Sequence, residues 1–357
     1  MAERALRIRI VLALALWLQA VCAGADTLAL RTEEGNIKGA LYRLAWPEHW
    51  NGKLLLFAHG LRPFDEPLRA PLDPARPVYR EMIERGWMVG ATSYRRNGII
   101  IGDAIDDLRR LRQHISERFG QPRQVLLMGD SMGGIIGTLI AERHADEFDA
   151  VLASGAALDL DRLDGPWGLN YHPKAPIVFL TNRSEIEAPA RYVQRASEAP
   201  APPALWRVER DGHVNVNDDE RLAAIDALLD YLETGALDRE RDGTIALESA
   251  SSAIEGNKGL GGTISGITSG HGNIFTSFVP EDLAKLGIEV GDRFMLTVND
   301  QSISVRLGTD YRDVALGEWI GILRAEGFLM LARNRENACR TLNCSTGDRV
   351  QISTLDE

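Results

Sequence analysis

Hydrophobic and polar positions alternate in two different ways along the chain. From about residue 40 to residue 235, short apolar runs alternate with longer stretches in which apolar residues recur at helical spacing. The clearest apolar runs are residues 53–58, 125–128, 150–154 and 176–180. Apolar strands separated by helices are typical of a mostly parallel sheet that helices cover on both faces. This part of the chain is therefore predicted to be an α/β domain.

The pattern changes after Gly235. Residues 237–261 are rich in charge, Ser and Gly, and they are predicted to be a linker. From residue 262 to residue 357, short stretches with alternating or β-branched residues are separated by turns. Asn299-Asp300 predicts a hairpin, and residues 280–287 predict a short helix that begins at Pro and ends at Gly. This region is predicted to be a smaller C-terminal β-barrel domain.

The clearest chemical signal lies directly after one of the apolar runs. Gly129-Asp130-Ser131-Met132-Gly133 connects residues 125–128 to a helix-like stretch at 134–141. A G-x-S-x-G sequence between a strand and a helix places the serine on a sharp, strained turn, where glycines avoid collisions with the neighbouring elements. Ser131 is therefore the candidate nucleophile, and the N–H of Met132 at the helix start is a candidate donor to the oxyanion.

A histidine occurs at the place where the partner base is expected. His213 follows the strand-like run 205–209 and precedes an amphipathic helix predicted at 221–233. A general base in this loop would take the proton of the serine and later return it. The sequence around His49, His114, His144 and His172 gives no such context, so these residues are expected to be structural.

These motifs make residues 26–236 resemble an α/β-hydrolase, in particular exported bacterial serine esterases and peptidase-like hydrolases. The resemblance implies that His59-Gly60-Leu61 forms the oxyanion turn, with the N–H of Leu61 as the second donor. It also implies an acid after the strand 176–180, where Glu-Ile-Glu-Ala-Pro lines up with the D-x-x-V-P sequence of many members. Glu185 is the first choice for the acid and Glu187 the reserve.

The N-terminal residues predict export. Three arginines precede the apolar run 10–18, and Ala23-Gly24-Ala25 offers a cleavage site before Asp26. Residues 1–25 are thus a predicted signal peptide, and the mature protein is expected in the periplasm or outside the cell, with no membrane span. In an oxidising compartment Cys339 and Cys344 are expected to form a disulfide.

Charge and composition limit the partners. The chain has 40 Lys and Arg against 51 Asp and Glu, which gives a net charge of −11. It has no basic patch with interleaved aromatic residues, so a nucleic acid partner is not expected. Two thiols without nearby histidines are too few to hold a metal, so neither a metal nor a cofactor is expected.

The C-terminal region resembles the C-terminal domain of SAM hydroxide adenosyltransferases and SAM-dependent halogenases. The resemblance rests on Gly272-Asn273, Gly317-Glu318-Trp319, residues 327–332 and residues 347–350. In that family the Asn of the Gly-Asn pair helps to hold adenine, which implies this position for Asn273. The companion domain of the family is replaced here by the hydrolase, so the barrel is expected to be a structural partner. By analogy with the family trimer, a homo-oligomer is expected.

Two functions are consistent with these features. The first is an exported serine hydrolase that cleaves a small-molecule carboxylic ester, with an amide as the less favoured alternative, through an acyl-enzyme with a Ser131–His213–Glu185 triad. The second is a non-catalytic binding or assembly protein that uses the barrel, with a nucleoside as one ligand. The intact serine, histidine and oxyanion-turn positions favour the first function.

Overall fold

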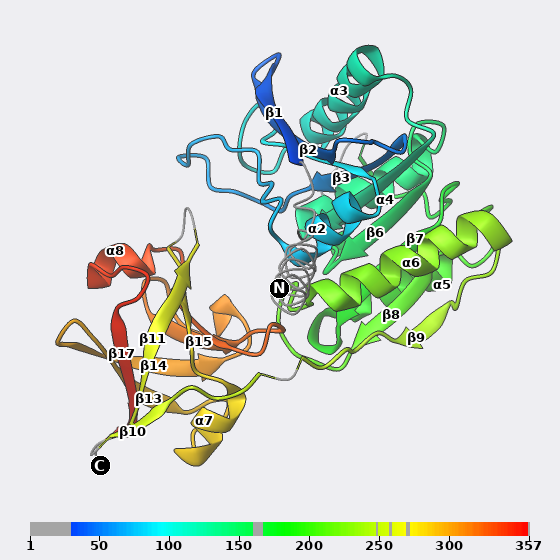
Figure 1. Cartoon of the computed structure of the whole chain (residues 1–357). Coiled ribbons are helices and arrows are strands. Elements are labelled where there is room, and N and C mark those ends of the chain that lie inside the picture. Colours follow the sequence, from blue (N-terminus) through cyan, green and yellow to red (C-terminus); the bar gives the residue numbers. More distant parts are fainter. Residues whose placement is uncertain (1–29, 160–166, 248, 257–258, 269–271, 356–357) are drawn as a thin grey trace, which may run out of the picture.

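The computed structural model describes residues 30–159, 167–247, 249–256, 259–268 and 272–355 (Figure 1). The predicted signal peptide, residues 1–25, lies outside the described residues. Among the described helices, none is both long and apolar enough to cross a membrane.

The N-terminal domain is built on a nine-stranded sheet. The strand order is β1-β2-β4-β3-β5-β6-β7-β8-β9, with β1 and β2 antiparallel to their neighbours and all later pairs parallel. The strands are β1 Leu30–Ile37, β2 Ala40–Pro47, β3 Lys53–Ala58, β4 Met88–Thr92, β5 Gln124–Asp130, β6 Ala150–Ser154, β7 Ile177–Asn182, β8 Ala204–Val208 and β9 Glu240–Asp242. The predicted α/β-hydrolase fold with a mostly parallel sheet is confirmed.

Helices cover both faces of this sheet because successive strand residues point in opposite directions. Leu54 and Leu56 of β3 pack with residues of α3 (Ile101–Phe119), α4 (Met132–Arg143) and α5 (Glu187–Arg195). Leu55 and Phe57 pack on the other face with α2 (Pro77–Glu84) and α6 (Asp218–Thr234). Each face thus has its own apolar core.

The strand order reverses direction at β3. β3 is followed in the chain by β4 on one side and lies beside β5 on the other. In open α/β sheets, ligands bind outside the carboxyl ends of the strands where the order reverses in this way. Both the turn after β3 and the turn after β5 open at this point.

The C-terminal domain is a closed seven-stranded barrel. The order β11-β12-β16-β15-β14-β13-β17 closes through pairing of β17 with β11, and β10 (Ile254–Gly256) extends β11. The barrel strands are β11 Gly259–Ile267, β12 Ile274–Thr276, β13 Arg293–Val298, β14 Gln301–Gly308, β15 Trp319–Leu323, β16 Leu329–Arg333 and β17 Arg349–Thr354. The predicted barrel is confirmed, and the predicted hairpin joins β13 to β14. Asn299 and Asp300 both have positive φ there, as a tight hairpin turn requires.

The segment expected to be a linker, residues 237–261, is shorter than expected. Glu240–Asp242 forms β9 and pairs in parallel with β8, so the hydrolase sheet takes up its first part. β10 and the start of β11 take up its last part. The sequence pattern did not indicate these strands because edge strands with exposed charged residues have little apolar periodicity.

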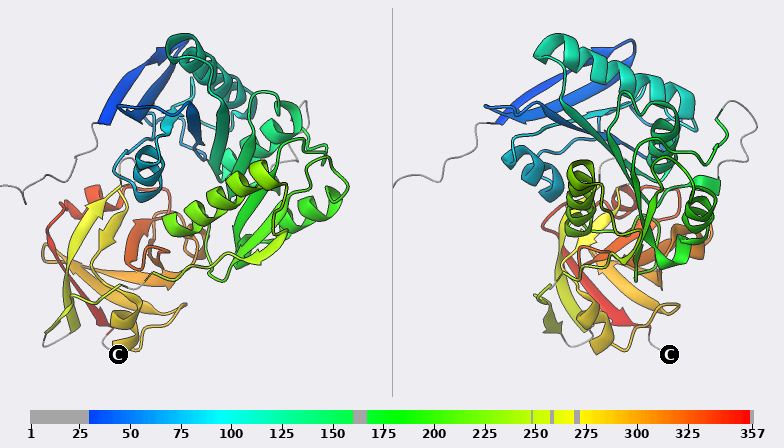
Figure 2. Two further views of the ribbon diagram at one scale, coloured as in Figure 1. Left: turned by 45° about the vertical axis from the view of Figure 1, so that its right-hand side comes forward. Right: turned by 90° about the vertical axis from the view of Figure 1, so that its right-hand side faces the viewer.

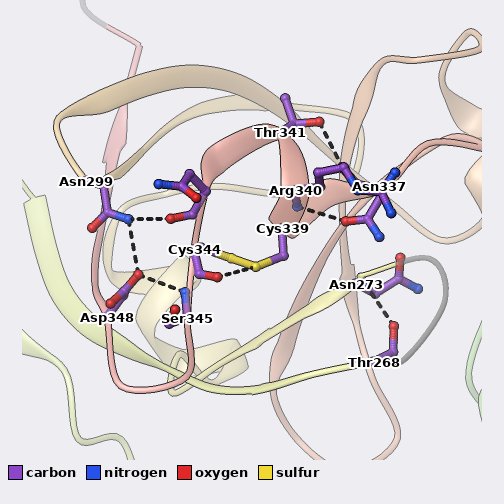
Figure 3. Close-up of a disulfide and its surroundings, with 11 residues drawn as sticks. Thr268, Asn273, Asn299, Asn337, Cys339, Arg340, Thr341, Cys344, Ser345 and Asp348 are labelled. Carbon is purple, nitrogen blue, oxygen red and sulfur yellow. Dashed lines mark hydrogen bonds between the residues drawn. A yellow bond between two sulfur atoms is a disulfide. The ribbon is translucent and has the colours of Figure 1, made fainter.

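A disulfide lies at the end of the barrel. Cys339 of α8 (Ala338–Leu342) is bonded to Cys344, with 5.1 Å between their Cα atoms (Figure 3). The bond joins α8 to the turn that leads into β17. Asn299 of the β13–β14 turn donates to the carbonyl of Asn343 and to the carboxylate of Asp348 beside it.

The two domains lie side by side, with β15 of the barrel directed toward the hydrolase domain (Figures 1 and 2). The contact includes a hydrogen bond that Asn215 of the hydrolase domain donates to the carbonyl of Leu323 at the end of β15, and one that it accepts from the N–H of Ala325 in the following turn.

Candidate active site

Ser131 occupies a strained turn between β5 and α4. Its φ of +57° and ψ of −114° lie in a region that residues other than glycine rarely adopt. The flanking glycines make this turn sterically possible. A Cβ atom on Gly129 would lie 2.1 Å from the carbonyl oxygen of Gly133, and one on Gly133 would lie 1.9 Å from that of Ala58. The local sequence therefore forces the serine side chain out of the sheet edge.

The structure brings the candidate nucleophile, base and acid together. Nε2 of His213 lies 2.8 Å from the Oγ atom of Ser131, and Nδ1 of His213 lies 2.6 Å from Oε2 of Glu185. The other carboxylate oxygen of Glu185 accepts a hydrogen bond of 3.1 Å from the N–H of Val214. The histidine ring is thus held between the serine and a carboxylate, which is the arrangement a Ser-His-acid triad needs.

Glu187, the reserve choice for the acid, lies elsewhere. Its side chain is 91% exposed and pairs with Arg191 one turn along α5. Glu185 ends a short 3-10 helix (Arg183–Glu185) after β7, whereas Glu187 begins α5. Two residues of helical backbone rotate the side chains to different faces, so only Glu185 reaches the histidine.

The oxyanion side of the site lies between β3 and α4. Met132 is the first residue of α4, so its N–H is one of the groups left without a helical partner. The turn after β3 runs alongside Ser131, since a Cβ on Gly60 would lie 3.2 Å from the Cβ of Ser131. Leu61 follows directly, and its side chain is exposed. Both expected donors therefore belong to segments that border the nucleophile.

His59 supports the oxyanion turn. It is buried, it stacks on the ring of Tyr94, and its Nδ1 lies 2.7 Å from the carbonyl oxygen of Gly60. Nε2 lies 3.2 Å from the carbonyl oxygen of Ser93. Burial, with the nearby charge of Arg62, lowers the pKa of His59 to about 4. The neutral ring has one N–H, so it donates to one of these two carbonyls.

A network of buried and half-buried charges lies next to the serine turn. Asp130 accepts a hydrogen bond of 3.2 Å from Arg221 of α6, and Arg221 also donates to the carbonyl of Val216. Arg221 lies 3.6 Å from Asp218, which in turn pairs with Arg76 ahead of α2. These ion pairs connect the residue before the nucleophile to two helices. No local sequence pattern indicates these pairs, because their members are 91 and 142 residues apart.

Hydrogen bonds to Asn182 hold the loop that carries His213. Asn182, at the end of β7, donates to the carbonyls of Arg210 and Asn215 and accepts from the N–H of Asn215. Both asparagines are buried. Neither was singled out from the sequence, although a polar residue at the end of the apolar run 177–182 was a signal that could have indicated Asn182.

The electrostatic surroundings of His213 include both domains. Burial lowers its pKa, but the hydrogen bond and charge of Glu185, together with Asp310 of the barrel, outweigh this effect, so the net pKa is raised. Arg312 of the barrel acts in the opposite direction. The loop after β14 thus contributes charge to the site.

The site is open to solvent. The side chain of His213 is 38% exposed. A crevice of about 640 Å³ lies between residues 63–69, in the Pro-rich loop that follows Leu61, and residues 335–340 of the barrel. It is lined mainly by charged side chains. The Pro-rich loop and the barrel therefore face each other near the oxyanion turn.

Two other features have residue types that could hold a ligand. Within the described part of the chain, the group of residues with metal-ligand spacing is His144, Asp146 and Glu147 at the far end of α4 from Ser131. Glu147 already accepts a hydrogen bond from Arg109.

Asn273, the position implied for adenine binding, is buried and donates to the hydroxyl of Tyr311 at 3.1 Å. Residues 269–271, which precede Gly272-Asn273, lie outside the described residues.

Comparisons with known proteins agree with this division. Residues 100–199 match the family model of serine aminopeptidase S33, and residues 270–351 match that of the SAM hydroxide adenosyltransferase C-terminal domain. No sequence among curated proteins matches the chain at a significant level.

Solved structures are similar at low identity. The esterase Pf2001 of Pyrococcus furiosus is 14% identical, with 58% of this chain and 92% of that chain covered and a TM-score of 0.43. Brefeldin A esterase, a bacterial homologue of human hormone-sensitive lipase, is 16% identical, with 59% and 78% covered and a TM-score of 0.40. An uncharacterised conserved protein of Thermotoga maritima is 22% identical, with 35% and 49% covered and a TM-score of 0.27. The present chain thus spans about half the length of the Thermotoga protein. The strand order and the two family matches together support an α/β-hydrolase-like domain followed by a barrel that is similar to the SAM hydroxide adenosyltransferase C-terminal domain.

Proposed function

We propose that this protein is a serine hydrolase that cleaves carboxylic esters through an acyl-enzyme intermediate. The observation that carries the proposal is the continuous hydrogen-bonded series from Ser131 through His213 to Glu185 at the strand-order switch of a hydrolase fold. A non-catalytic protein has no need to keep this series together with the strained serine turn.

The chemistry follows from the positions of these groups. Oγ of Ser131 attacks the ester carbonyl carbon while Nε2 of His213 takes its proton, and the N–H groups of Leu61 and Met132 stabilise the oxyanion. The protonated histidine then donates to the alkoxide, and the alcohol leaves. Water attacks the acyl-enzyme, with His213 again as base, and the carboxylic acid is released as Ser131 regains its proton. Glu185 keeps the ring in one tautomer and stabilises its cation.

A labelling experiment tests the proposal. A fluorophosphonate probe should label the wild-type protein, and Ser131→Ala should abolish labelling and the hydrolysis of p-nitrophenyl esters while the protein stays folded. Absence of label on the folded wild type would instead favour the binding or assembly function. Esters of graded chain length and aminoacyl p-nitroanilides in the same assay distinguish ester from amide cleavage.

Export is part of the same proposal. The arginines, apolar run and small residues of positions 1–25 support it. The mature protein recovered from the periplasm or medium should begin at Asp26. An exported protein that still begins at Met1 would contradict the proposed export and cleavage.

A further inference from the structure

We infer that the barrel positions the catalytic histidine, with Asn215 and Arg324 as positioning residues. Residues 323–325, at the end of β15 and the start of the turn that leads to β16, hold the loop of His213 in place. This inference rests on the proposed function, because His213 is the general base there.

Asn215 connects the two domains two residues after the histidine. Its side-chain amide donates to the carbonyl of Leu323 at 3.1 Å and accepts from the N–H of Ala325 at 2.7 Å. The same amide donates to the carbonyl of Asp211, two residues before the histidine, at 2.9 Å. Asn215 is 1% exposed, so these bonds are made away from water. One side chain therefore ties both ends of the histidine loop to the barrel.

Arg324 acts on the residue next to the histidine. Its guanidinium donates to the carbonyl of Val214 at 3.3 Å, and the N–H of Val214 donates to Glu185. Val214 has a φ of +49°, which is an outlier for a β-branched residue. Such a conformation persists only where the surroundings determine it strongly. The triad acid fixes one side of this strained residue, and the barrel fixes the other.

A second barrel segment, the one that follows β14, lies beside Gly212, the residue before the histidine. Gly212 has a φ of +125°, and a Cβ there would lie 3.2 Å from the carbonyl oxygen of Thr309. The segment is rigid, because the carboxylate of Asp313 accepts from the N–H groups of Thr309 and Asp310. Backbone of the barrel thus borders the histidine loop at Gly212 as well as at Val214.

These contacts between the barrel and the hydrolase domain all involve the loop that carries His213. The connection between the domains leaves the hydrolase after β9, where Ile245 accepts a bond from Asn217 at the start of α6. This covalent connection after β9 by itself would be enough to join the two domains. The described hydrogen bonds of the β15–β16 turn to the hydrolase domain instead go to Val214 and Asn215.

The test uses the full chain with three variants and a matched control. Arg324→Met removes the bond to Val214, Arg324→Lys keeps the charge, and Asn215→Asp replaces both amide donors with an acceptor. Ser249→Ala is the control, because the Ser249 hydroxyl donates to the carbonyl of Glu326 in the same turn, and no hydrogen bond among the described residues joins it to the histidine loop.

We expect Arg324→Met and Asn215→Asp to lower kcat for a p-nitrophenyl ester at least tenfold, with KM within threefold of wild type. Fluorophosphonate labelling should slow in parallel. Arg324→Lys should recover most of the rate, and Ser249→Ala should match wild type. The acidic limb of the pH–rate profile should also move in Arg324→Met, since a displaced ring changes its distance to Glu185, Asp310 and Arg312.

Rates within threefold of wild type in folded Arg324→Met would overturn the inference. Arg324 is partly exposed on the barrel side, so this variant remains informative if Asn215→Asp does not fold. Failure of the proposed function is a separate result: the wild type itself would then not be labelled.

Discussion

Nε2 of His213 and Oγ of Ser131 lie 2.8 Å apart although 82 residues separate them in the chain. β6, β7 and β8 fill that interval and place both residues at the same edge of the sheet, because parallel strands share their carboxyl ends.

The first prediction separates the two candidate acids. Glu185→Gln should lower kcat by about 10³- to 10⁴-fold, because the histidine loses the carboxylate that selects its tautomer. Glu187→Gln, at a solvent-exposed position two residues away, should stay within about twofold of wild type. Ester hydrolysis by the two purified variants is the measurement, and the reverse order would move the acid to Glu187.

The second prediction concerns pH. His213 must be neutral to accept the serine proton, so activity falls as the pH drops through its raised pKa. Asp310→Asn removes a charge that raises this pKa, so the acidic limb of kcat/KM should shift to lower pH. Arg312→Gln removes a charge of opposite effect and should shift the limb to higher pH. Coincident profiles for both variants and the wild type would show that the barrel charges do not act on the histidine.

The third prediction tests the serine turn. Gly133→Ala places a methyl group 1.9 Å from a backbone oxygen that cannot move freely, so it should lower the free energy of unfolding by more than about 2 kcal/mol. Gly266→Ala in β11 is the matched control, because its methyl would meet Phe275 at 3.7 Å. Urea unfolding of both variants checks the difference. Equal stabilities would mean that the turn relaxes more than its packing suggests.

The fourth prediction concerns His59 and stability. Its pKa is lowered from 6.5 to about 4, so the unfolded state binds a proton more readily than the folded state. Its contribution to stability is therefore present above pH 6.5 and is lost as the pH falls toward 4, by about 3 kcal/mol in total. His59→Gln should show a shallower loss of stability over this range than wild type, in urea unfolding at several pH values. The exposed His172→Gln should follow the wild-type slope.

The fifth prediction concerns the disulfide. Replacing Cys339 and Cys344 together by Ser should lower the free energy of unfolding by about 2 kcal/mol, as loop-closure entropy gives for so short a loop. Guanidinium unfolding without reductant measures the loss. Adding reductant to the wild type should reproduce it, while the double variant should not respond.

Local sequence determined the central strands of the sheet and the turn that carries the candidate nucleophile. The apolar runs and helical periods predicted the parallel sheet, and Gly129-Asp130-Ser131-Met132-Gly133 predicted the serine turn, because the constraints involved act within a few residues. The hairpin at Asn299-Asp300 was predicted for the same reason, since a two-residue turn depends on its own φ values.

Tertiary structure decided what depends on contacts between distant segments. The pattern after β7 left Glu185 and Glu187 both open, and only the docking of the histidine loop against that segment brings one of them into contact. The roles of Asn182, Asn215 and Arg324 also depend on neighbours that no local pattern specifies. Such residues carry no periodic signal, because a hydrogen bond across domains is set by how two folded surfaces meet and not by the residues beside it in the chain.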